Sequence, residues 1–81
     1  MGRYGRDTGL APEEVLRQAA EFFGPDGLGL KVVEQNDCCV SFEGGGGHVM
    51  VSAASSESGR TDVELETREW DFQVRSFMER L

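Results

Sequence analysis

Hydrophobic and polar side chains alternate on both sides of a glycine run between residues 38 and 54, CCVSFEGGGGHVMVSAA. Numbering outward from Gly45-Gly46 opposes apolar residues with one another: Phe42 with Val49, Val40 with Val51, and Cys38 with Ala53. The interleaved residues point the other way: Glu43 with His48, Ser41 with Met50, and Cys39 with Ser52. Because side chains alternate along a strand, a slip of one residue would oppose apolar and polar positions throughout. The pattern predicts a β-hairpin closed by an even-numbered loop, such as a two-residue type I′ turn or a four-residue loop.

A helical pattern precedes this hairpin and predicts a helix over residues 12–23. Pro12 suits the first helical position, and Glu13 and Glu14 suit the first turn. The apolar residues recur on a single stripe: Val15, Leu16, Ala19, Phe22 and Phe23. Gly24-Pro25 is a typical end signal, so we expect the helix to stop there and to pack its stripe on a core.

Alternation also predicts one strand before the hairpin and one after it. In residues 28–33, a following loop of odd length would keep Leu30 and Val32 on the same face as Phe42. After the polar turn 55–59, Val63 and Leu65 are expected to point inward. The intervening acidic residues then point outward: Asp62, Glu64 and Glu66.

The C-terminal segment predicts a second helix over residues 68–80, with Thr67 as its N-cap. Its apolar stripe comprises Trp70, Val74, Phe77, Met78 and Leu81. At 100° per residue, Phe72 lies about 200° from Trp70, on the side that faces water. Phe72 is therefore either an isolated exposed aromatic residue or part of an interface.

The predicted fold class is α+β, with the order helix, four antiparallel strands, helix. Every connection is short and the apolar alternation lies on one sheet face, so we expect a meander with both helices packed on that face as a two-layer sandwich. Residues 10–81 form a single domain in this interpretation. Residues 1–9, MGRYGRDTG, lack an apolar period and are expected to form a disordered tail.

The net charge of −7 argues against partners that are themselves negatively charged. Binding to phosphate backbones depends on Lys and Arg contacts, so neither nucleic acid nor an anionic membrane is an expected partner. No apolar run reaches the roughly 18 residues of a membrane span, and no apolar leader segment is apparent. The expected location is the cytoplasm.

Two sequence features resemble chemical motifs without meeting their requirements. Four glycines precede His48, but a phosphate-binding loop needs a trailing Gly-Lys-Ser/Thr and must begin a helix. Cys38 and Cys39 are adjacent and are expected to point to opposite faces of one strand, so both are predicted to be free thiols. Zinc sites generally use CxxC-type spacing, which is absent, and no cofactor is expected.

The hairpin register also decides which polar residues can act together. Cys39 and His48 are four residues apart along the register, about 13 Å at roughly 3.3 Å per residue, too far for a nucleophile and its base. Glu43 and His48 are directly opposed, with an expected Cβ separation of about 5 Å. They are either an acid–base pair or pH sensor, or an exposed and weak ion pair, and we favour the weak ion pair.

The outward-facing side of the sheet carries the remaining candidate residues. The binding candidates are Glu43, His48, Met50, Cys39 and Ser52. A partly apolar strip on this side consists of Val33, Cys39, Met50, Ser41 and Ser52. The candidates for an interface are Met50 and Val33 on this strip and Phe72 on the helix. For self-association we favour the strip, because it is broader than a single phenylalanine.

We therefore expect a small binding or structural module without catalysis of its own. Its expected partner is a second copy or another protein. The alternative is a minimal enzyme or small-molecule-binding domain, with a cleft between sheet and helices or across a dimer.

Overall fold

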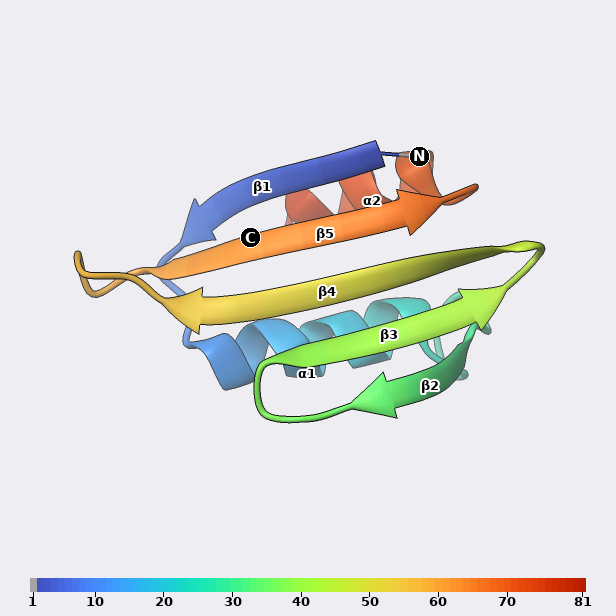
Figure 1. The fold of residues 1–81 in the computed structure, drawn as a ribbon, viewed down its shortest axis with the longest axis horizontal. Helices are drawn as coiled ribbons and strands as arrows, with labels where there is room; N and C mark the ends of the chain where they lie inside the picture. The colour runs from blue at the N-terminus through green and yellow to red at the C-terminus, as the bar shows by residue number, and fades with distance from the viewer. Residues whose placement is uncertain (1) are drawn as a thin grey trace.

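The computed structural model describes residues 2–81 as an α+β domain with a five-stranded antiparallel sheet and two helices. The elements are β1 (Gly2–Thr8), α1 (Pro12–Phe23), β2 (Lys31–Gln35), β3 (Cys39–Gly44), β4 (Gly47–Ser55), β5 (Thr61–Arg68) and α2 (Asp71–Met78). The strand order is β1-β5-β4-β3-β2, and both helices lie on the same side of the sheet (Figure 1). The expected two-layer arrangement is therefore confirmed, but the expected number of four strands is wrong.

The additional strand is β1, in the segment that the sequence predicted to be a disordered tail. It pairs with β5 along its whole length, from Gly2 opposite Thr67 to Thr8 opposite Thr61. Its side chains also bond to distant segments: the Tyr4 hydroxyl donates to Asp71 Oδ2 at 2.5 Å, and this bond raises the pKa of Tyr4. β5 and Asp71 lie far from β1 along the chain, so the local pattern of apolar residues does not predict this strand.

The central hairpin has the predicted register. Phe42 is opposite Val49, Val40 is opposite Val51, and Glu43 is opposite His48. Gly45 and Gly46 form the turn with φ values of 59° and 82°, in the left-handed region that a type I′ turn requires. The two-residue alternative is therefore the correct one.

A bulge in β2 sets the face of the strand that precedes the hairpin. Val32 is opposite Phe42, but the register shifts before Glu34, which is opposite Ser41. The turn between the paired residues Gln35 and Val40 contains four residues, so the expected loop of odd length is wrong. The bulge residue Val33 compensates for this and keeps Val32 on the expected face, that of Phe42. Val32 consequently packs against the core while Val33 stays exposed.

Helix α1 has the predicted bounds, whereas α2 begins later than expected. Thr67 is not its N-cap: the residue is buried in β5, and its hydroxyl donates to the His48 carbonyl oxygen at 2.8 Å. Strand pairing with β4 continues to Arg68, and Glu69 then turns the chain with φ of 76°. Pairing to β4 therefore prevails over the local helical pattern.

The core fills the space between the sheet and the helices. Phe23, Phe42 and Phe77 are fully buried, and ring-centroid distances of 5.5 Å between Phe23 and Phe42 and 5.3 Å between Phe23 and Phe77 connect both helices to β3. Within residues 2–81, no side-chain nitrogen or oxygen is buried without a hydrogen-bond partner. In the same range, neither helix is long and apolar enough to cross a membrane.

Candidate functional site

The candidate site lies on the side of the sheet away from the helices, which we call the bare face. Since α1 and α2 both pack on the other side, none of the elements described in residues 2–81 covers it (Figure 1). Cross-strand pairing places all of the predicted binding residues there: Cys39 opposite Ser52, Ser41 opposite Met50, and Glu43 opposite His48. An antiparallel sheet with one solvated face usually carries polar residues on it, and the 39% exposure of Met50 departs from that pattern.

Glu43 and His48 lie at the turn end of the bare face. They share a shallow hollow of about 540 Å³ with Lys31 and Arg68, the neighbours opposite Glu43 and His48 on β2 and β5. No hydrogen bond or ion pair within residues 2–81 joins Glu43 to His48. A general acid or base must be held within hydrogen-bond reach of its proton, and nothing described orients the imidazole here.

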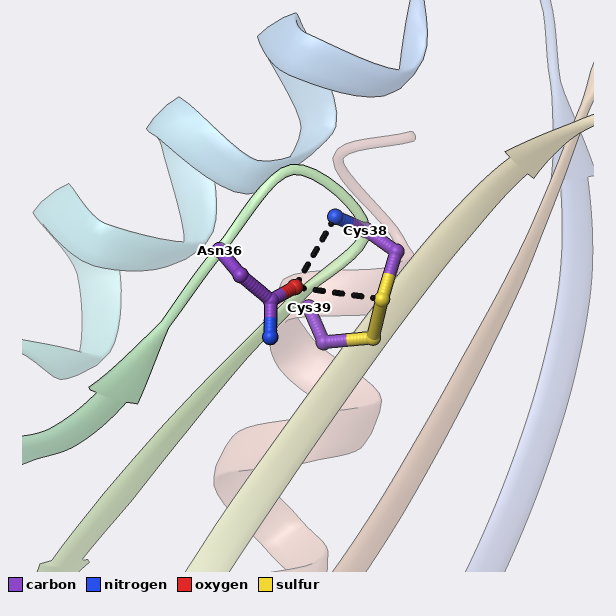
Figure 2. The surroundings of a disulfide bond; sticks show 3 residues. All are labelled: Asn36, Cys38 and Cys39. Carbon is purple, nitrogen blue, oxygen red and sulfur yellow. Dashed lines mark hydrogen bonds between the residues drawn. A yellow bond between two sulfur atoms is a disulfide. The ribbon is translucent and has the colours of Figure 1, made fainter.

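Cys39 forms a disulfide with Cys38, so the prediction of two free thiols is wrong (Figure 2). That prediction requires Cys38 and Cys39 to lie in one strand, where their side chains would point to opposite faces. Instead β3 begins at Cys39, and Cys38 belongs to the preceding turn, where its amide N–H donates to Asn36 Oδ1 at 3.0 Å. The same oxygen lies 3.2 Å from Cys38 Sγ, which carries no hydrogen in the disulfide.

A second hollow of the bare face, of about 450 Å³, lies over β1, β5 and β4, and we call it the Gly5 hollow. Two cross-strand rows build it. One row runs Gly5–Glu64–Ser52, and the next runs Arg3–Glu66–Met50. Gly5 has no side chain and that of Ser52 is small, so the long side chains of Glu64 and of the second row rise around these two positions.

The electrostatic character of the Gly5 hollow is acidic. Glu64 and Glu66 project from the same face of β5, and Asp62 continues the series. Arg3 Nε lies 3.7 Å from Glu66 Oε2, and its side chain is 79% exposed. The Glu66 side chain is 27% exposed, and a pair with so exposed a cation contributes little stability.

The interface candidates do not form one patch. Val33 and Met50 line a small hollow on the bare face and are 45% and 39% exposed. Phe72 is 72% exposed on α2, in the helix layer on the other side of the sheet. A single planar contact therefore cannot cover Met50 and Phe72 together.

Two other site types lack support in the described chain. Residues 2–81 contain no group of three or more His, Cys, Asp or Glu side chains arranged to hold a metal ion. The alternative hypothesis places a cleft between the sheet and the helices, but side chains of the core fill this space. Val15, Phe23 and Val51 are fully buried there.

Sequence reasoning missed Arg3 and Gly5 because both belong to β1. The one available signal was that Tyr4 and Thr8 share a strand face, which is weak in a segment with two glycines. Comparison of the chain with models of known families, with curated proteins and with solved structures gave no match.

Proposed function

We propose that the protein is a small non-catalytic binding module whose bare face binds a basic segment of another protein. The observation that carries the proposal is the Gly5 hollow, which combines an apolar side chain, Met50, with the carboxylates of Glu64 and Glu66. An Arg or Lys side chain has a long apolar stem and a cationic end. Its stem would pack on Met50 while the cationic end lies between the two carboxylates.

The charge of the whole chain supports the same choice of partner. A net charge of −7 attracts cations and raises their rate of encounter at low ionic strength. The contact would be salt-dependent, because Glu64 is exposed and Glu66 partly so, and bulk ions screen such charges over about 10 Å at 0.1 M.

The test is an NMR titration of isotope-labelled protein with an amidated decapeptide of alternating arginine and serine. We expect the largest shift changes at Gly5, Met50, Ser52, Glu64 and Glu66, and their loss in high salt. The same peptide with glutamate in place of arginine should give none.

A pair of double variants separates local recognition from overall charge. Glu64→Gln/Glu66→Gln should weaken binding about tenfold or more, since it removes both charge-assisted bonds. Glu13→Gln/Glu57→Gln removes the same charge at exposed positions on α1 and in the β4–β5 turn, and it should bind nearly as the parent does. Equal weakening by both variants, or shift changes confined to the His48 end, would reject the proposal.

A further inference from the structure

The two edges of the sheet differ in whether they can accept another strand. At one edge, β2 is five residues long and interrupted by the bulge at Val33. A short bulged strand discourages edge-to-edge pairing. At the other edge, β1 has seven residues in continuous register with β5, without a proline or a bulge. No element described in residues 2–81 lies beyond it, so its outer hydrogen-bonding groups form an open edge (Figure 1).

The sequence of β1, GRYGRDT, is complementary to itself when read antiparallel. A two-fold axis perpendicular to the sheet relates the two copies without turning either sheet over, so each side chain stays on its own face. Because directly opposed residues share a face, the residue at the axis must be opposite the same residue of the second copy. Centring on Gly5 pairs all seven residues and opposes Arg3 with Asp7 of the second copy, twice by symmetry. Centring on Arg6 would oppose two arginines, and centring on Tyr4 would leave Asp7 and Thr8 unpaired. Cross-strand pairs of opposite charge stabilise a sheet, whereas like charges destabilise it.

The helix layer provides a second surface beside the open edge. A groove of about 550 Å³ is lined by Tyr4 and Arg6 of β1 and by Phe72, Arg75 and Met78 of α2, among others. A copy paired to β1 brings its own α2 to this groove. The exposed ring of Phe72 would then lose contact with water, and Tyr4 would oppose Arg6 of the second copy, a favourable cation–π arrangement.

We propose that two copies of the chain associate through β1, antiparallel and centred on Gly5, to form one continuous sheet of ten strands. Strand pairing supplies backbone hydrogen bonds, as in β-strand addition generally. The α2 helices add the area that a specific interface of about 1,000 Å² or more requires. Both bare faces point the same way, so two Gly5 hollows lie next to each other across the axis.

Cross-linking tests the register directly. Gly5→Cys is compatible with the fold, since the nearest atom to a Cβ at this position is the Val63 carbonyl oxygen at 3.9 Å. In a Cys38→Ser/Cys39→Ser background, a short bis-maleimide should convert this variant to a covalent dimer. Ser52→Cys is the matched control: it lies in the same cross-strand row, but its two copies would be about 24 Å apart at roughly 4.8 Å per strand. A Gly5→Cys variant that cross-links no better than Ser52→Cys overturns the proposal.

Sedimentation of charge-swapped variants tests the energetics. The parent should be dimeric at roughly 100 μM, and Arg3→Asp or Asp7→Arg alone should weaken the dimer about tenfold. The double variant Arg3→Asp/Asp7→Arg exchanges the charges and should restore the dimer. Met50→Glu should leave it intact. A monomeric parent, or dissociation by Met50→Glu with no effect of either charge swap, overturns the proposal.

Discussion

The indole N–H of Trp70 donates a hydrogen bond to the carbonyl oxygen of Gly44 at 2.9 Å. This bond connects the residue that precedes α2 to the strand that enters the central turn, 26 positions earlier in the chain. The indole also lies over the turn, because a Cβ added to Gly45 would stand 2.8 Å from Trp70 Cζ2. The glycine run is therefore constrained by tertiary packing as well as by the geometry of the turn.

Trp70→Phe removes the hydrogen bond and retains an aromatic ring. We expect a loss of about 1 kcal/mol in the free energy of unfolding, the usual net contribution of such a bond. Urea unfolding followed by circular dichroism measures it. An unchanged midpoint would mean that solvent replaces the indole as the donor without cost.

Asparagine substitutions at the two turn glycines should have unequal effects. Both positions have positive φ, which asparagine tolerates better than most residues. A Cβ at Gly46 meets no atom within 4 Å, whereas a Cβ at Gly45 collides with the indole. We expect Gly46→Asn to melt close to the parent and Gly45→Asn to lose about 1–3 kcal/mol by overpacking. Equal melting temperatures would contradict the placement of Trp70.

Phe42→Ala tests the assignment of the core face. Phe42 is fully buried against Phe23, and such truncations cost about 3–5 kcal/mol, enough to unfold much of a small domain. Phe72→Ala is the matched control, since it deletes the same side chain where 72% of it is exposed. At low protein concentration we expect the control to change stability by about 0.5 kcal/mol or less. Similar thermal melts for the two variants would place Phe42 outside the core.

Acid titration should reveal the ion pair on α1. The hydrogen bond from Arg17, followed by that from Gln18, lowers the pKa of Glu14 from 4.5 to about 2. Because the folded pKa is the lower one, the stabilisation is present above pH 4.5 and is lost as the pH falls towards 2. NMR of the side-chain carboxyl should give a midpoint near 2, and Arg17→Ala should raise it. A midpoint that Arg17→Ala leaves unchanged would exclude the guanidinium as the cause.

Replacing both cysteines by serine should have little effect on stability. A disulfide stabilises mainly by closing a loop in the unfolded chain, and the Cys38–Cys39 bond joins adjacent residues, so it closes almost none. We expect the thermal midpoint to shift by a few degrees at most. A large loss would show that packing of the turn around Asn36 depends on the bond.

Local patterns predicted the elements whose partners are near in sequence. The register of β3 and β4 follows from matching apolar faces across two glycines, and α1 follows from its stripe and its proline. Thr67 shows the limit: its local context favours a helix cap, but hydrogen bonding to β4 keeps it in a strand. A sequence window contains no information on a strand partner that lies outside it.

The candidate site was predictable only in part, for the same reason. Met50 and Ser52 were placed on the correct face because their hairpin register is local. The Gly5 hollow could not be predicted, since it exists only when β1 lies beside β5. A glycine- and arginine-rich segment has little intrinsic preference for a strand, so its sequence does not indicate this pairing.

The pairing of β1 with β5 also sets an order of events during folding. The β3–β4 hairpin closes over two residues, a microsecond process, while Asp7 and Arg60 must meet across 53 positions. Pairing of distant strands requires closure of a long loop, which costs conformational entropy before any pairing is gained. β1 is therefore expected to join the sheet last. On the ribosome β1 is made before the strand it pairs with, and until it docks the long edge of β5 stays open. Any factor that delays this docking extends the period in which a nascent chain exposes β5 to pairing with other chains.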